Sequence, residues 1–244
     1  MTATKRIIII GATSGIGYEV AKIYCQKGWR IGIAGRRLPL LEQLRSEAPE
    51  QIETEQIDVT QADAPERLAA LIRKVGGMDL FLLSSGIGSQ NRELDPAIEL
   101  ATVETNTLGF TRMVTAAFNY FKENGGGHLA VISSIAGTKG LGAAPAYSAT
   151  KRYQNMYIDT LDQLTHIEKL PIRFTDIRPG FVQTALLKKR KYPLLMLPDY
   201  AAQRIVRALE RKKRVAIIDW KYEILVFFWR LIPNFIWRKL PIHN

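Results

Sequence analysis

The sequence contains a single cysteine, Cys25, among its 244 residues, so no disulfide can form within the chain. Its three histidines, His128, His166 and His243, lie far apart and lack the ligand spacing of a zinc site. The apolar run Ile7–Ile10 near the N-terminus is too short for the apolar region of a signal peptide. We therefore expect a cytoplasmic protein that binds no metal.

Acidic residues are scarce only in the last part of the chain. Residues 1–170 contain 18 Lys and Arg against 18 Asp and Glu, whereas residues 171–244 contain 16 against 5. The whole net charge of +11 therefore comes from the C-terminal third. This distribution indicates an anionic partner, which can be a membrane surface, an acidic carrier protein, an anionic substrate or a nucleic acid. We expect no nucleic acid, because no aromatic and basic platform of the RNA-binding type is visible.

The proportions of hydrophobic residues (47%) and charged residues (23%) are those of an ordinary globular protein. Short β-branched or apolar segments, typical of buried strands, alternate with segments of helical periodicity. Strands are expected at residues 7–10, 30–34, 51–57, 78–84, 128–133, 171–177 and 214–218, and helices at 16–27, 38–48, 62–75, within 95–124, 146–168 and 199–212. The fold class is therefore α/β, a single Rossmann-type doubly wound parallel sheet of about seven strands with helices on both faces. We expect this domain at residues 1–219 and a hydrophobic helical appendix at 220–244.

A glycine-rich turn follows the first strand. Glycines at this position let the backbone approach a pyrophosphate, and the helix that follows presents free N–H groups to it. The spacing is G-x3-G-x-G, and the candidate cofactor-binding residues of the turn are Gly11, Thr13, Ser14, Gly15, Ile16 and Gly17. The alternative is a tight strand-to-helix turn that binds nothing.

The end of the second strand reads Ala34-Gly35-Arg36-Arg37 and contains no acid. An NAD-binding fold places an acid here against the ribose 2′-hydroxyl, whereas a guanidinium binds a 2′-phosphate. Arg36 and Arg37 therefore predict NADP(H) as the cofactor. The alternative is a solvated arginine pair at the start of a surface helix.

Two Tyr-x3-Lys patterns occur, Tyr18 with Lys22 and Tyr147 with Lys151. A lysine one helical turn from a phenol favours the ionised phenol and would lower its pKa, as a proton donor to a carbonyl requires. We select Tyr147, because it follows Ser134 by thirteen residues and Ser134 ends a central strand. Ligands of open α/β sheets bind at that edge.

Together, the glycine turn, Asn106, Ser134 and the Tyr147–Lys151 pair resemble the short-chain dehydrogenase/reductase superfamily over residues 5–218. The resemblance implies that Tyr147 is the general acid/base, that Ser134 hydrogen-bonds the substrate oxygen and that Lys151 tunes Tyr147 and holds the nicotinamide ribose. It implies that Asn106 supports a proton-relay water. It also implies further cofactor contacts at Asp58, Val59, Gly86, Pro179, Gly180 and Thr184. Asn106 as a helix cap and Ser133 as the active hydroxyl remain alternatives.

The sequence departs from the family where Leu83-Ser84-Ser85-Gly86 replaces the usual Asn-Asn-Ala-Gly after the fourth strand. Ser84 thus stands in place of an asparagine that braces the sheet, so that bracing is in question. Residues 185–197 are the expected substrate segment, in which apolar residues flank the cations Lys188–Lys191. This pattern suits a lipid-like or acyl substrate with an anionic end, or equally an amphipathic lid over the cofactor.

The appendix contains three of the four tryptophans, and none of its uncharged runs, Ile224–Trp229 among them, is long enough to span a bilayer. Pro233 is expected to divide it into two short helices. On a helical projection the polar residues are Glu223, Arg230, Asn234 and Arg238, and the opposite side contains Ile224, Leu225, Phe228, Ile232, Phe235 and Ile236. We expect this side to lie in the interface of an anionic membrane; the alternative is packing on the protein's own body or on a second subunit.

The sequence thus predicts an NADP(H)-dependent reductase of an apolar or lipid-like carbonyl, or the reverse alcohol dehydrogenase. One alternative is a 3-oxoacyl-carrier-protein reductase, whose basic patch would dock an acidic carrier. A non-catalytic NADP(H)-binding sensor or scaffold is the alternative from another class. The family resemblance further implies a homo-oligomer built on helices 105–123 and 147–166.

Overall fold

The computed structural model describes residues 4–187 and 192–242. Parallel strands form one seven-stranded sheet in the order β3-β2-β1-β4-β5-β6-β7. The strands are β1 (Arg6–Ile10), β2 (Arg30–Gly35), β3 (Ile52–Gln56), β4 (Leu80–Leu83), β5 (Gly127–Ile132), β6 (Ile172–Pro179) and β7 (Val215–Ile218). The strand order changes direction between β1 and β4, which is the place where open α/β sheets bind ligands. The predicted doubly wound parallel sheet is confirmed.

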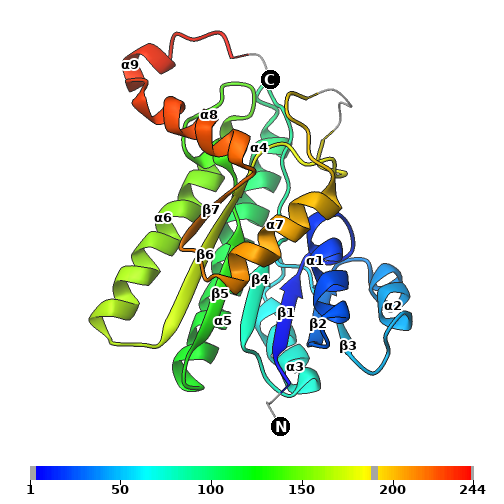
Figure 1. Cartoon of the computed structure of the whole chain (residues 1–244). Coiled ribbons are helices and arrows are strands. Elements are labelled where there is room, and N and C mark those ends of the chain that lie inside the picture. Colours follow the sequence, from blue (N-terminus) through cyan, green and yellow to red (C-terminus); the bar gives the residue numbers. More distant parts are fainter. Residues whose placement is uncertain (1–3, 188–191, 243–244) are drawn as a thin grey trace.

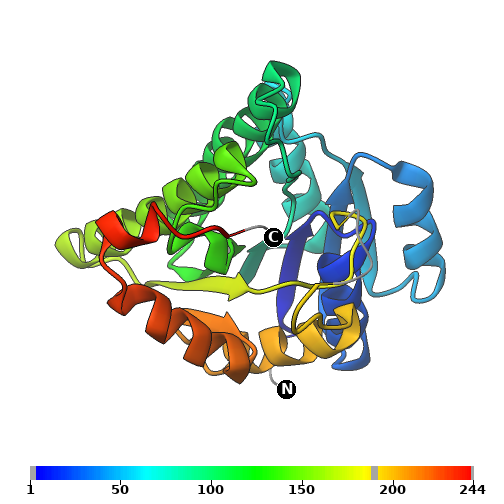
Figure 2. The same ribbon diagram turned by 90° about the horizontal axis from the view of Figure 1, so that it is seen from above.

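Helices cover both faces of the sheet (Figure 2). They are α1 (Gly15–Gln26), α2 (Leu38–Ser46), α3 (Ala64–Val75), α4 (Pro96–Val103), α5 (Phe110–Glu123), α6 (Pro145–Ile167), α7 (Pro198–Glu210), α8 (Trp220–Leu231) and α9 (Asn234–Trp237). Helices α1, α2, α7 and α8 bury side chains in one core cluster, and α3, α5 and α6 bury theirs in a second.

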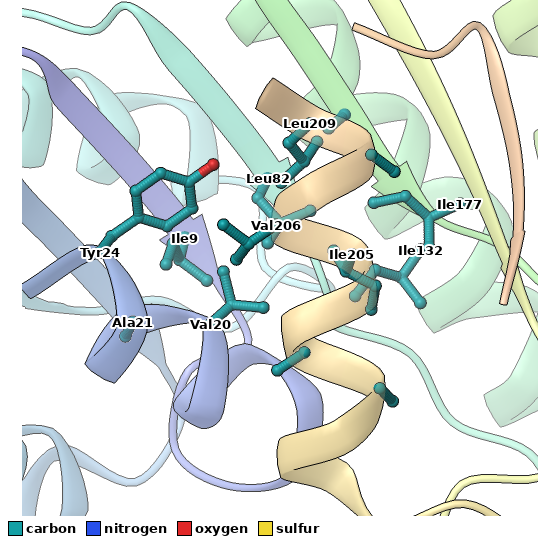
Figure 3. Packing of buried hydrophobic residues seen from close by; sticks show 14 of the residues in the cluster. Ile9, Val20, Ala21, Tyr24, Leu82, Ile132, Ile177, Ile205, Val206 and Leu209 are labelled. Atoms are coloured by element: carbon teal, nitrogen blue, oxygen red, sulfur yellow. The ribbon is translucent and has the colours of Figure 1, made fainter. Parts of the chain in front are cut away.

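The isoleucine run of β1 explains why the sheet is covered on both sides. Ile7 and Ile9 belong to the first core cluster and Ile8 and Ile10 to the second, and all four are completely buried. Successive strand residues point to opposite faces, so only a strand with two covered faces buries such a run. Figure 3 shows part of the first cluster, in which α1 and α7 pack against each other over the central strands. The labelled residues are Ile9, Val20, Ala21, Tyr24, Leu82, Ile132, Ile177, Ile205, Val206 and Leu209.

One helical stretch contains a type of helix that the sequence did not predict. The helical region within 95–124 contains a π-helical turn, η1 (Glu104–Gly109), between α4 and α5. Single π-helical turns occur mostly where a helix must place a functional group, and η1 carries the candidate Asn106. Elsewhere the strands and helices expected on residues 1–219 end within two residues of their predicted bounds.

The C-terminal segment folds back beside α6 at the carboxyl edge of the sheet (Figure 1). The side chain of Asp219 caps α8 by accepting a hydrogen bond from the backbone of Lys221 at 2.9 Å. Pro233 separates α8 from α9, so the predicted division into two helices is confirmed. Trp237 Nε1 donates to the carbonyl of Gly140 at 2.7 Å and ties α9 to the loop that follows β5. Among the described helices, none is both long enough and apolar enough to cross a membrane.

Candidate active site

The glycine turn after β1 leaves no room for a side chain at its glycine positions. A Cβ on Gly11 would lie 2.5 Å from the backbone nitrogen of Ser85, and one on Gly17 would lie 2.4 Å from the carbonyl oxygen of Gly11. Gly15 has a φ of +62°, and a Cβ there would lie 3.0 Å from Cγ2 of Thr184. The turn therefore needs glycine for both space and conformation, and Thr184 lies beside it.

The hydroxyls of the same turn meet an arginine from the end of β2. Arg37 donates through Nη2 to Oγ1 of Thr13 at 2.7 Å and to Oγ of Ser14 at 2.8 Å. The neighbouring Arg36 is exposed, and among the described contacts its carbonyl accepts from Gln56 Nε2 at 2.8 Å. A guanidinium held beside this glycine turn is placed to contact an anion there.

The predicted cofactor contacts Asp58 and Val59 follow the carboxyl end of β3. Asp58 accepts hydrogen bonds from the backbone nitrogen and the hydroxyl of Thr60, at 3.0 and 2.9 Å, which fixes the start of this loop. Val59 is buried, and a Cβ on Gly109 would lie 2.7 Å from its Cγ2. Val59 therefore packs on η1. Another predicted cofactor contact, Ile16 at the start of α1, is half-buried against the first core cluster.

The three proposed catalytic side chains come together at the carboxyl end of β5. Ser134 follows β5 and accepts a hydrogen bond from the backbone of Ala136 at 3.1 Å. Tyr147 and Lys151 lie one turn apart near the start of α6, with the ammonium 5.7 Å from the centre of the phenol ring. Gly88 packs against the other side of that ring, since a Cβ there would lie 2.4 Å from the ring carbon Cδ2. Sequence reasoning missed Gly88, which only the folded loop brings to Tyr147.

The pKa of Tyr147 runs opposite to the sequence expectation. Burial raises the pKa of Tyr147, because the phenolate would lose its water, and hydrogen bonding with Ser134 offsets only part of that increase. Burial also lowers the pKa of Lys151 to about 8, while the negative charge of Asp176 acts in the opposite direction. The expectation that Lys151 lowers the pKa of Tyr147 is therefore wrong for the protein alone, in which Tyr147 is protonated at neutral pH.

Asn106 lies on η1 and is completely buried. Its amide nitrogen donates to the carbonyl of Ile87 at 2.7 Å and to the hydroxyl of Thr150 at 3.2 Å, and its Oδ1 accepts from the nitrogen of Ile87 at 2.9 Å. A Cβ on Gly86 would lie 3.2 Å from Oδ1 of Asn106 and 3.5 Å from the ammonium of Lys151. Asn106 thus joins the loop after β4 to α6, and Gly86 lies against both groups.

Ser133 belongs to a buried polar network that sequence reasoning missed. Ser133 donates to the carboxylate of Asp176, and Asn155 donates to both Ser133 Oγ and Asp176 Oδ2 at 2.9 Å. Arg178 forms an ion pair with Asp176 at 2.6 Å, and all four side chains are buried. This network occupies Ser133, which supports Ser134 as the hydroxyl available to a ligand. The acid and the arginine on β6 were the available signal, because charges in a central strand require partners.

The segment after β6 is held by the C-terminal helix. Pro179 ends β6, and its carbonyl lies 3.5 Å from the hydroxyl of Ser134. A Cβ on Gly180 would lie 2.1 Å from the ring of Tyr222 on α8. The hydroxyl of Tyr222 also accepts from the nitrogen of Phe181 at 3.0 Å. Of the predicted cofactor contacts in this segment, Gly180 therefore rests on α8. The predicted cationic run Lys188–Lys191 lies outside the described residues.

The second Tyr-x3-Lys pattern lies elsewhere, on α1, where Tyr18 is partly buried against the first core cluster. Tyr18 is 3.5 Å from a carboxylate oxygen of Glu47, and the Lys22 ammonium is 5.4 Å from the Tyr18 ring centre. Burial and the nearby Glu47 raise the pKa of Tyr18. Among the residues the structure covers, no three His, Cys, Asp or Glu side chains are grouped as metal ligands.

The glycine turn, the Ser134–Tyr147–Lys151 group and the parallel sheet agree with the comparisons to known proteins. The short chain dehydrogenase family model matches residues 5–193. An uncharacterised oxidoreductase of Myxococcus xanthus is 31% identical over 238 residues, which cover 94% of this chain and 93% of that protein. The chain belongs to the short-chain dehydrogenase/reductase family and is an NAD(P)-dependent oxidoreductase.

More distant relatives extend the likeness. Dehydrogenase/reductase SDR family member 7B of Bos taurus is 27% identical over 260 residues, covering 96% of this chain and 79% of that protein. An alcohol dehydrogenase from Thermococcus sibiricus, complexed with 5-hydroxy-NADP, superposes with a TM-score of 0.76 at 25% identity over 88% of this chain and 95% of that one. A 3-ketoacyl-(acyl-carrier-protein) reductase from Brucella melitensis, complexed with NADH, shares the fold with a TM-score of 0.78 at 24% identity over 88% and 96%.

Proposed function

We propose that this enzyme is an NADP(H)-preferring reductase of a carbonyl on an apolar or lipid-like substrate, or the reverse alcohol dehydrogenase. The observation that carries the proposal is the grouping of Ser134, Tyr147 and Lys151 at the carboxyl edge of the sheet, beside the glycine turn. The cofactor preference is supported by Arg37, whose guanidinium lies over that turn, and by the lack of an acid at Ala34–Arg37.

The residues present fit the cofactor. Gly11 and Gly17 let the turn pack closely on its own backbone and on Ser85, and α1 begins directly after it. The free N–H groups at the start of α1 would bind the pyrophosphate. We assign the 2′-phosphate to Arg36 and Arg37 and the nicotinamide ribose to Tyr147 and Lys151. When bound, the cofactor supplies or accepts the hydride.

The proton chemistry of the site favours reduction. A donor to a carbonyl oxygen must be protonated, and the raised pKa of Tyr147 keeps its phenol in that form at neutral pH. Ser134 and Tyr147 then hydrogen-bond the substrate oxygen as negative charge develops there. Lys151, with a pKa of about 8, retains a proton near neutral pH and restores it to Tyr147.

The test is the oxidation of NADPH, followed at 340 nm, with ketones and aldehydes of increasing chain length. We expect turnover that improves with chain length and is faster with NADPH than with NADH at low cofactor concentration. Absence of turnover with every carbonyl, while NADPH still binds, would support the non-catalytic sensor instead.

The basic C-terminal third supports one further candidate, a 3-oxoacyl-carrier-protein reductase. An acidic carrier would dock on these cations. Comparing acetoacetyl groups on the carrier protein and on coenzyme A tests this candidate. A preference for the carrier-bound form that disappears in high salt would favour it over the reduction of free carbonyls.

We also propose that the C-terminal segment attaches the enzyme to an anionic membrane surface. One side of α8 exposes large apolar residues at helical spacing, and α9 continues this side; we call these residues the apolar stripe: Trp220, Ile224, Phe227, Phe228, Leu231, Phe235 and Ile236. The other side of α8 buries Tyr222 and Val226 in the protein's own core, so the proposed membrane contact concerns only the exposed side. Leu225, expected on the exposed side, packs against that core.

The cations Lys221 and Arg230 flank the stripe, and an apolar face with tryptophan and basic flanks is typical of interfacial helices. We expect full-length enzyme to sediment with vesicles containing phosphatidylserine, and Leu231→Asp to weaken this binding at least about tenfold. Leu100→Asp is the control, because Leu100 is equally exposed but lies on α4. Equal vesicle binding by both variants would refute membrane attachment through the stripe.

We propose further that the enzyme is a homo-oligomer built on helices 105–123 and 147–166, which correspond to η1, α5 and α6. Leu108 on η1 and Met156 on α6 are exposed there. Met156→Asp is therefore expected to dissociate the oligomer in analytical ultracentrifugation, and Leu231→Asp to leave it intact. Dissociation by Leu231→Asp alone would identify the apolar stripe as the subunit contact.

A further inference from the structure

The ammonium group of Lys151 is enclosed by groups of this chain. Lys151 is 4% exposed, and its ammonium donates to the carbonyl of Ile132 on β5 at 3.0 Å. It donates a second hydrogen bond to Oε1 of Gln154, also at 3.0 Å. An ammonium has three N–H donors, so one remains for the catalytic side of the site.

Gln154 connects this ammonium to η1. Its Nε2 donates to the carbonyl oxygen of Asn106 at 2.8 Å, and the side chain is 2% exposed. A single amide thus accepts from Lys151 and donates to Asn106. By family resemblance, the Asn106 region supports a water that continues the proton relay, and here a side chain of the protein makes the corresponding link.

We propose that Gln154 is a positioning residue, which holds the Lys151 ammonium against β5 and fixes it to the π-helical turn through the Asn106 carbonyl. An amide keeps its own protons under these conditions, whereas a water passes them on. Gln154 therefore orients Lys151 and does not carry protons away from it. Only the delivery of a proton from Lys151 to Tyr147 rests on the proposed function; the positioning of Lys151 by Gln154 does not.

The cost of burying an ammonium explains why the link matters. Each hydrogen bond to a buried charge stabilises the charged form, and Lys151 has few other sources of such stabilisation. The titratable and charged groups that face it are Tyr147 on α6 and Asp176 on β6, and Asp176 is already paired with Arg178. Loss of the Gln154 acceptor would therefore destabilise protonated Lys151 without changing any charge around it.

The experiment follows the titration of Lys151 in the cofactor-free protein by NMR, using lysine labelled with ¹³C at Cε. The Lys151→Arg variant assigns the signal. We expect a pKa of about 8 in the wild type. The isosteric Gln154→Met variant should lower it by about 1–2 units, which is the loss of one hydrogen bond to a charged group. Gln163→Met is the matched control, because Gln163 is an exposed glutamine on the same helix, and it should leave the value unchanged.

A second measurement needs no variant at Gln154. The side-chain amide protons of Gln154 should exchange with solvent far more slowly than those of Gln163, since they are bonded to Asn106 in a buried site. An unchanged Lys151 pKa in Gln154→Met, or fast exchange of the Gln154 amide in the wild type, overturns the proposal. Both readouts use protein without substrate, so their failure is distinct from a failure to reduce carbonyls.

Discussion

Replacing Arg37 with alanine isolates the group that we assign to the 2′-phosphate of the cofactor. Arg37 is exposed, yet its guanidinium is held over the glycine turn by the hydroxyls of Thr13 and Ser14. The side chain therefore needs little reorganisation to meet a phosphate. Arg36 is exposed too, but it has no comparable anchor among the described contacts.

The magnitude follows from the environment of Arg37. A hydrogen bond between charged groups contributes about 1.5–3 kcal/mol, and solvent exposure places this one in the lower part of that range. At about 1.5–2 kcal/mol, Arg37→Ala should weaken NADPH about 10- to 30-fold while changing NADH by less than about twofold. The loss should shrink in high salt, because the contact is screened. Titration of cofactor fluorescence at two salt concentrations measures both effects.

Two further variants sharpen this test. Arg37→Lys keeps the charge but loses the forked geometry, so it should fall between the wild type and Arg37→Ala. Arg45→Ala is the control, because Arg45 is a partly exposed arginine on α2, the helix that Arg37 precedes, and its described ion pair is with Glu42 at 3.4 Å. If Arg37→Ala weakened NADH as much as NADPH, Arg37 would serve only to hold the glycine turn. Equal affinity of the wild type for both cofactors would remove the basis of the assignment.

Three other substitutions test the fold and the site. Burial lowers the pKa of His128 to about 4, below the 6.5 of an unfolded histidine, so the stability that neutral His128 contributes is lost as the pH falls from about 6.5 toward 4. The free energy of unfolding measured with urea should therefore decrease by about 2 kcal/mol between pH 7 and 5, and His128→Gln should abolish this decrease. Gly180→Ala should destabilise the fold by about 1–3 kcal/mol through its clash with Tyr222, and a double-mutant cycle with Tyr222→Ala should show that most of this loss depends on the ring. Gly88→Ala should displace the ring of Tyr147 and reduce turnover by about 10²-fold with NADPH binding retained, as measured by steady-state kinetics and titration.

The fold was predictable because the hydrophobic pattern and the turn residues of each segment predict the same strands and helices that the packed sheet requires. The run Ile7–Ile10 indicated a strand buried on both faces, and the glycine turn and Pro233 marked the ends of elements. The π-helical turn Glu104–Gly109 was not predictable, because its sequence differs little from that of an ordinary helix. Its place depends on contacts of Asn106 with Ile87 and with Thr150, which are distant in sequence.

The site was predictable in its residues but not in its electrostatics. The Tyr-x3-Lys spacing, together with the position after Ser134 at the end of a central strand, identified Tyr147 and Lys151. The direction of the pKa shift of Tyr147 depends on burial, which no spacing reveals. Gln154 carries no motif and is recognisable only through its two hydrogen bonds. The sequence also did not reveal which apolar residues of α8 lie in the core and which lie on the surface, because only the fold divides them.

The most direct test of the central claim compares Tyr147→Phe with Tyr18→Phe in NADPH-dependent reduction of a carbonyl that the wild type accepts. Both variants lose one phenol hydroxyl from a Tyr-x3-Lys pattern, but only Tyr147 lies beside Ser134. We predict that Tyr147→Phe binds NADPH as the wild type does and loses about 10²–10⁴-fold in kcat, whereas Tyr18→Phe stays within about twofold. Comparable rates for the two variants would contradict the assignment of Tyr147 as the proton donor.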